Sequence, residues 1–286
     1  MSCLRRGAVL RWGGKVKNNK TSVFSAMGIM LAALAGVVLS SNVALAFTNA
    51  SLKGTYSYTF TKFTADPTQN QINSVGIFTF DGISAVTYTE TDDNAGTVGT
   101  ETGSGTYSVN ANGTGSMTLT NSGNGNMTKF SISLNSAGKG FQILQTSCHD
   151  TCNNDVNTGV AVAQQGTSYS NASLKGAFGF LTNTWTPTST VTAEAGVGFV
   201  NFDGVSKVTA SITDNQAGSV VTFSESGSYS VSPNGSGTLS LTNSKNGQIT
   251  TASFVITSAG KQLQYLITSC GSSCANEVQS GTAIHQ

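Results

Sequence analysis

Two pairs of cysteines have the spacing that most directly suggests chemistry. Cys148 and Cys152 form one Cys-x3-Cys pair, and Cys270 and Cys274 form the other. Cysteine and histidine are common zinc ligands, and His149 lies inside the first pair. The second pair has glycine where the first has histidine. No metal ligands are therefore predicted, because the two pairs share only their cysteines.

A disulfide within each pair is the role that both pairs can share. Residues four apart in a straight strand lie ~13 Å from each other, whereas the Cα atoms of bridged cysteines lie within about 7 Å. The bonds Cys148–Cys152 and Cys270–Cys274 would therefore require the chain to turn at these two places. We predict that each bond clamps one corner of a folded domain.

Carboxylates offer a second kind of chemistry. Glu90 and Glu101 lie in neighbouring apolar runs, so they could face each other, as the paired carboxylates of a general acid and base do. The two histidines, His149 and His285, are a further possible source of a catalytic base. None of these residues recurs at the matching position of the other copy, as the repeat described next shows. We predict a protein that is not an enzyme and has no catalytic residues and no cofactor.

The chain is one module copied twice. The segment Asn49–Gly54 returns unchanged as Asn171–Gly176, and the same offset of 122 residues relates the cysteine pairs at 148 and 270. Repeats of solenoid proteins are about 20 to 50 residues long, so each copy here should be a complete domain with its own core. We predict one domain over residues 47–165 and the other over residues 169–286.

The first 46 residues have the order of a secretory signal peptide. Six basic residues precede an apolar run from Val23 to Leu39, and Ala44-Leu45-Ala46 then provides a small-x-small cleavage site. The alternative is a membrane anchor, but a run of this length is at the short limit for spanning a bilayer. We predict cleavage and a secreted, extracellular protein, with the periplasm as the alternative location.

Composition excludes one class of partner. Without its leader the chain keeps eight of its fourteen Lys and Arg residues, none of them Arg, against thirteen acidic residues. A face that binds nucleic acid needs clustered Lys and Arg to neutralise phosphates. We therefore expect no nucleic-acid partner, and a surface made mostly of Thr, Ser and Asn.

Apolar residues alternate with Thr and Ser in eight runs per copy, which is the pattern of half-buried antiparallel strands. The connections between the runs are short, and Asp81-Gly82 is a dipeptide that a tight type I′ hairpin prefers. In the first copy the runs are 52–60, 78–80, 86–88, 103–109, 117–119, 130–134, 141–143 and 159–164.

Short links favour an all-β fold of two eight-stranded, up-and-down antiparallel barrels. A β-sandwich is the alternative, but a Greek-key sandwich needs long crossovers between its sheets. Closure also removes exposed strand edges. One long link, from Thr61 to Ser74, breaks the pattern of short hairpins.

Leu52-Lys53-Gly54-Thr55-Tyr56 resembles the first-strand pattern Leu-x-Gly-x-Trp of the calycin group, the lipocalin and avidin-type barrels. The long first link is similar to the loop across a lipocalin mouth. The chain departs from that family in having neither the tryptophan at this position nor an arginine to close the barrel base. The two copies also resemble uncharacterised bacterial secreted repeats, a likeness that covers more of the chain.

The calycin resemblance implies a small hydrophobic ligand inside the barrel. Phe63 in one copy and Trp185 in the other would then lie near the mouth, under the first loop. An eight-stranded barrel has room for its own side chains and little else, so a filled core is the primary expectation.

The sequence thus predicts a non-enzymatic, exported binding or structural module. Two copies in tandem can gain avidity for a repetitive target, so a glycan, envelope or matrix surface is the expected partner. The alternative is a lipocalin-like carrier of a small hydrophobic ligand, and an unrecognised enzyme ranks third. The oligomeric state is not predicted.

Overall fold

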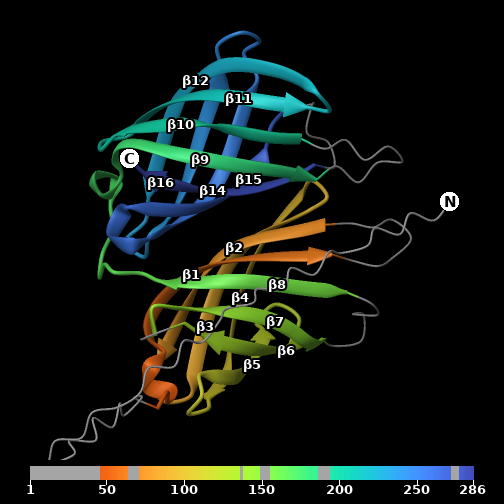
Figure 1. Ribbon diagram of the computed structural model, residues 1–286, viewed down its shortest axis with the longest axis vertical. Coiled ribbons are helices and arrows are strands. Elements are labelled where there is room, and N and C mark those ends of the chain that lie inside the picture. Colours follow the sequence, from red (N-terminus) through yellow and green to blue (C-terminus); the bar gives the residue numbers. More distant parts are fainter. Residues whose placement is uncertain (1–45, 64–70, 136–137, 149–154, 186–193, 272–276) are drawn as a thin grey trace, which may run out of the picture. The chain divides into compact units, whose positions relative to one another are not determined.

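The computed structural model describes residues 46–63, 71–135, 138–148, 155–185, 194–271 and 277–286 (Figure 1). Almost all regular structure in these ranges is β-strand, with a few short 3-10 turns. No helix in these ranges has the length and apolar character needed to cross a membrane. Residues 1–45, which hold nearly all of the predicted leader, lie outside the described part of the chain.

The first repeat forms a closed barrel of eight antiparallel strands. Each strand pairs with the next along the chain, and the last strand, β8, pairs with β1 to close the ring. The elements are η1 (Asn49–Ser51), β1 (Lys53–Phe63), β2 (Gln71–Asp81), β3 (Ala85–Asn94), β4 (Thr97–Val109), β5 (Thr114–Asn121), β6 (Met127–Leu134), β7 (Gly140–Cys148) and β8 (Val156–Ala163).

The second repeat forms a second closed barrel with the same order, and its last strand, β16, closes on β9. The predicted up-and-down barrels are therefore confirmed, and the sandwich alternative is excluded. The elements are η3 (Asn171–Ser173), β9 (Lys175–Trp185), β10 (Glu194–Asp203), β11 (Lys207–Gln216), β12 (Ser219–Val231), β13 (Ser236–Asn243), β14 (Ile249–Thr257), η4 (Ser258–Gly260), β15 (Gln262–Ser269) and β16 (Val278–His285).

The type I′ turn predicted at Asp81-Gly82 is wrong. A type I′ turn needs positive φ at both central residues, and of this pair only Gly82 has it (φ 83°). Instead, the Asp81 carboxylate accepts hydrogen bonds from three successive backbone N–H groups of a longer connection, at 2.7 to 2.9 Å. These bonds lower the pKa of Asp81. Ala95 and Gly96, which join β3 to β4, do both have positive φ.

The long first link is shorter than the sequence suggested. β1 extends to Phe63 and β2 begins at Gln71, so both strands continue into what was read as the loop from Thr61 to Ser74. Polar residues weaken the apolar signal at these strand ends, Thr61-Lys62 in β1 and Asn73-Ser74 in β2, but they do not prevent the backbone pairing.

One end of each barrel is closed by a tyrosine lock. In the first barrel the Tyr107 hydroxyl donates to the carbonyls of Asn49 and Leu52, each at 3.0 Å, and so ties η1 across the base. The Asn49 side-chain oxygen accepts the Val109 N–H at 2.7 Å. Tyr229, Asn171, Leu174 and Val231 repeat this arrangement in the second barrel. The base of each barrel is therefore sealed by the segment that the two repeats share.

Aromatic rings fill the centre of the first barrel. Tyr58 stacks on Phe78 with 3.9 Å between ring centroids, and Phe60 stacks on Phe130 at 5.5 Å. Phe141 packs against Phe78 at 6.2 Å. The predicted filled core therefore holds at the centre of this barrel, whereas a pocket lies at its mouth. The buried core residues are Leu52, Tyr56, Tyr58, Phe60, Phe78, Phe80, Val86, Tyr88, Tyr107, Met117, Leu119, Phe130, Ile132, Phe141, Ile143 and Ala161.

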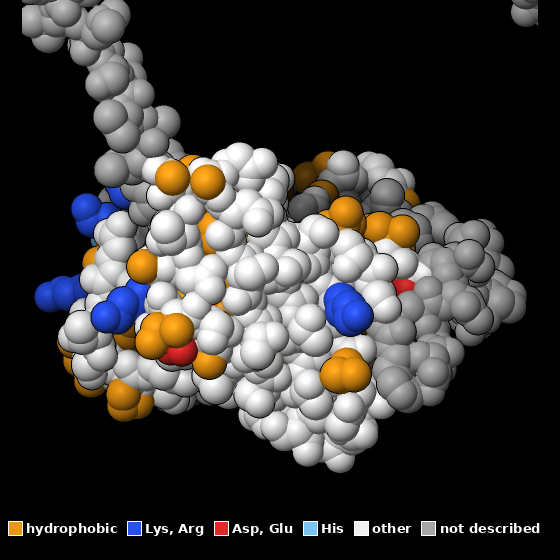
Figure 2. Space-filling view, turned by 90° about the horizontal axis from the view of Figure 1, so that it is seen from below, with side chains coloured by type: hydrophobic (Ala, Val, Ile, Leu, Met, Phe, Trp, Pro, Cys, Tyr) orange, Lys and Arg blue, Asp and Glu red, His pale blue; other side chains and the backbone are white. Residues whose placement is uncertain are grey.

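The face drawn in Figure 2 carries few charged side chains, and these are separated by wide areas of uncharged polar side chains and backbone. Hydrophobic side chains on this face are scattered and do not form one continuous patch. This agrees with the Thr-, Ser- and Asn-rich surface that the composition predicts.

Candidate binding cavity

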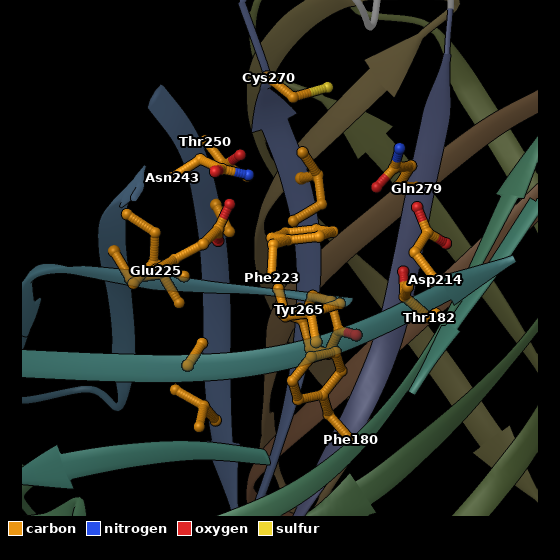
Figure 3. A pocket seen from close by; sticks show the side chains of 18 of the residues that line it. Phe180, Thr182, Asp214, Phe223, Glu225, Asn243, Thr250, Tyr265, Cys270 and Gln279 are labelled. Carbon is orange, nitrogen blue, oxygen red and sulfur yellow. The ribbon is translucent and has the colours of Figure 1, made fainter. Parts of the chain in front are cut away.

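The second barrel contains a cavity of about 380 Å³ (Figure 3). It extends from the end of the barrel opposite the tyrosine lock down to apolar side chains near the centre. The deep walls are made by Val200, Phe202, Leu239, Leu263 and Ala283, and the outer rim carries Thr182, Thr184, Asn243, Asn246, Gln248 and Gln279. The filled core predicted for both domains is therefore wrong for this one.

The cavity exists because the second repeat has lost ring-bearing side chains from its interior. Five aromatic core residues of the first barrel are replaced by non-aromatic ones, and three changes go the other way. The losses are Phe60 to Thr182, Phe78 to Val200, Tyr88 to Ala210, Phe130 to Ala252 and Phe141 to Leu263. The gains are Glu101 to Phe223, Ile132 to Phe254 and Ile143 to Tyr265. Rings bury more area than aliphatic side chains, so the exchange leaves space at the centre.

Glu225 projects from β12 into this space (Figure 3). Its side chain is buried, with 6% of the residue exposed. The carboxylate makes no hydrogen bond or ion pair with any residue in the described part of the chain. Burial disfavours the ionised form and raises the pKa of Glu225 to about 7.

Two facing residues on neighbouring strands differ between the two barrels at the place where Glu225 lies. Glu225 lies directly opposite Ala210 on β11, and the corresponding pair in the first barrel is Gly103 opposite Tyr88. The Tyr88 ring lies over Gly103 so closely that a Cβ there would be 2.3 Å from the ring. The second repeat thus replaces a ring over a glycine with a carboxylate over an alanine.

A second acidic group lies across the cavity from Glu225 (Figure 3). The Gln216 amide donates to Asp214 at 3.1 Å and to Glu194 at 3.0 Å, and so holds the two carboxyl groups together. Burial, together with the neighbouring Asp214, raises the pKa of Glu194 to about 7. This pair therefore shares an internal hydrogen-bond network, whereas Glu225 has none.

Replacing Glu225 with glutamine is expected to stabilise the protein at alkaline pH and not at acid pH. The pKa of Glu225 is raised in the folded state above its unfolded value of about 4.3, so the wild type loses stability as the pH rises from about 4.3 to about 7. We expect glutamine to recover about 2 kcal/mol at about pH 8, a value discounted because the cavity opens to water. Urea unfolding at about pH 4 and about pH 8 measures the difference in unfolding free energy between the variant and the wild type. An equal difference at the two pH values would contradict the prediction.

The corresponding mouth of the first barrel is smaller and its carboxylates have partners. A pocket of about 270 Å³ lies there, and Tyr58 donates to Glu90 at 2.8 Å while Asn121 donates to Glu101 at 2.7 Å. Glu90 and Glu101 lie directly opposite each other on β3 and β4, as the sequence suggested. Burial raises the pKa of Glu90 to about 7. Lys62 forms an ion pair with Asp155 at 2.8 Å.

The residues predicted near the barrel mouths are Phe63 and Trp185. Phe63 ends β1 with 46% of the residue exposed, and it lines no described pocket. Trp185 is the last residue of β9, but its side chain and the following segment 186–193 lie outside the described residues. Their predicted role near a ligand stays a prediction.

The predicted disulfides also stay predictions. Cys148 ends β7, and Cys270 follows β15 at the rim of the cavity, where the Gln248 amide donates to its carbonyl. Cys152 and Cys274 lie outside the described residues. In the described ranges no group of three or more His, Cys, Asp or Glu residues is placed to hold a metal ion.

Sequence reasoning missed Glu225 and the lost rings as parts of a site. It searched for chemistry common to both copies, and these features are present because the copies differ. A position-by-position comparison of the repeats contains the signal, since the chain has an acidic residue at 225 and glycine at 103.

Comparisons with known proteins assign no family. No family model matches the chain, and no curated protein matches it. Among solved structures, the chain is similar to a protein of unknown function from the DUF3598 family of Nostoc punctiforme. The match has 9% sequence identity and a TM-score of 0.27, and it covers 82% of this chain and 97% of the other. At this TM-score the likeness says nothing further about the fold or the site.

Proposed function

We propose that the chain is an exported, non-enzymatic binding protein whose second barrel holds one small, largely apolar molecule. The first barrel is then a filled structural domain. The observation that supports this most is the cavity of about 380 Å³ at the centre of the second barrel, with apolar walls, a polar rim and a closed base. This is the general form of a small-molecule binding site.

The leader and the calycin-like first strand agree with this proposal. A signal peptide would deliver the protein to the cell exterior or the periplasm, and a calycin-type barrel is a common container for an apolar ligand. A glycan, envelope or matrix surface as partner stays a prediction.

Extraction of the purified full chain with organic solvent, followed by mass spectrometry, tests the proposal on the natural ligand. We expect an apolar molecule at close to one per chain when the protein is purified from its own cells.

Linear alcohols test the cavity directly. Each added methylene should strengthen binding about fourfold, since burying one contributes about 0.8 kcal/mol, until the cavity is full. An affinity that does not change with chain length would contradict the proposal.

A further inference from the structure

We infer that the ligand of the second barrel has a protonated amine on an apolar body, and that the Glu225 carboxylate binds the amine. This inference rests on the proposed function and adds the chemical class of the ligand. It depends on where the charges of the barrel lie and on which of them have partners.

Of the acidic residues that line the cavity, Glu225 is the one without a partner among the described residues. Its neighbours on the flanking strands are Ala210 and Asn243, and neither supplies a cation. Burial makes the ionised form of Glu225 costly, because no cation or hydrogen-bond donor among the described residues compensates for the lost solvation. A bound ammonium group would supply the missing charge and hydrogen-bond donors, because an ammonium nitrogen has three N–H groups and no acceptor.

The other charges around the cavity also favour a cation. Asp214 and Glu194 lie across from Glu225, and Glu277 is close enough to raise the pKa of Glu194. Lys245 at the rim is exposed, and its ammonium group donates to the Thr222 carbonyl at 2.5 Å. Among the described residues, acidic groups therefore outnumber basic ones at the cavity, and a ligand carboxylate would be repelled.

The apolar side chains of the deep walls indicate that the part of the ligand away from the amine is apolar. Val200, Leu239 and Leu263 lie below the level of the carboxylates and offer no polar side chain to a ligand. The Tyr265 hydroxyl also lines the cavity, but it donates to the Leu181 carbonyl at 3.1 Å. An alkyl or aryl group can fill this part of the cavity while the amine stays at the height of Glu225.

Binding of such a ligand should release a proton. Burial raises the pKa of Glu225 to about 7, so in the empty protein near neutral pH about half of these groups are protonated. An ammonium beside the carboxylate favours the ionised form, and the carboxylic acid proton then leaves to solvent. Titration in two buffers with different ionisation enthalpies detects this release.

Octylamine, octanol and octanoate test the inference, because they share one chain length and differ in charge. We expect the full chain to bind octylamine at least about tenfold more tightly than octanol in calorimetric titrations, and octanoate more weakly than either. Glu225→Gln should weaken octylamine binding by about 10- to 100-fold and change octanol binding by less than about threefold.

Glu90→Gln is the matched control, because it makes the same change at a buried carboxyl group of the first barrel. It should leave octylamine affinity unchanged, and a loss like that of Glu225→Gln would overturn the inference. Equal binding of octylamine and octanol, unaffected by Glu225→Gln, would also overturn it while leaving the proposed apolar site intact. If none of the three compounds binds to the wild-type protein, the proposed function itself fails.

Discussion

Replacing Ala252 and Val200 with phenylalanine should abolish ligand binding by the second barrel. Both residues are buried and face the barrel interior, and the first barrel has phenylalanine at both corresponding positions, Phe130 and Phe78. Two rings placed there would occupy the space that a ligand needs. We expect octanol affinity to fall at least about tenfold for Ala252→Phe and at least about 100-fold for the double variant, since each displaced methylene contact is worth about 0.8 kcal/mol.

Val197→Phe is the control for this experiment. Val197 lies on β10, three residues from Val200, but points away from the barrel interior and is 55% exposed. The same ring added there should leave octanol affinity unchanged. Circular dichroism and urea unfolding establish that each variant is folded. Undiminished binding by a folded double variant would place the ligand outside this cavity.

Phe78→Ala should destabilise the first barrel far more than Val200→Ala destabilises the second. Phe78 is fully buried and contacts the rings of Tyr58, Phe80 and Phe141. Removing a buried phenylalanine ring typically costs about 3 to 5 kcal/mol, because the packed surroundings cannot collapse into the space. Val200 already borders open space, so truncating it should cost about 1 kcal/mol.

Hydrogen exchange of backbone amides in β2 and β10 measures the two costs separately, strand by strand. Protection in β2 should fall steeply in Phe78→Ala, whereas protection in β10 should change little in Val200→Ala. Equal losses of protection in both strands would mean that the two barrel interiors are equally well packed, which would contradict the cavity in the second barrel.

The barrel architecture could be predicted from the sequence because the required signals are local. Apolar alternation sets the strands, and short polar connections exclude the long crossovers of a sandwich. Turn geometry was harder to predict, because the Asp81 carboxylate draws three backbone N–H groups into a longer connection that a dipeptide rule does not describe. The ends of β1 and β2 were missed because apolar residues become sparse there while pairing continues.

The cavity could not be predicted from the pattern of either copy alone. Alternation identifies which side chains point inward, but whether they fill a barrel depends on the summed size of residues far apart in sequence. Tyr88 and Gly103 fill their space together, and Ala210 and Glu225 do not. Only the pairing of β11 with β12 shows that Ala210 lies opposite Glu225, so that the Glu225 carboxylate faces open space.

A crystal structure of the full chain with bound bromo-octanol tests the central claim most directly, because anomalous scattering locates the bromine atom. We predict one bromine peak inside the second barrel, among the apolar walls near Val200 and Leu239, and no peak inside the first barrel. A peak in the filled first barrel, or an empty second barrel in crystals grown at saturating bromo-octanol, would contradict the account.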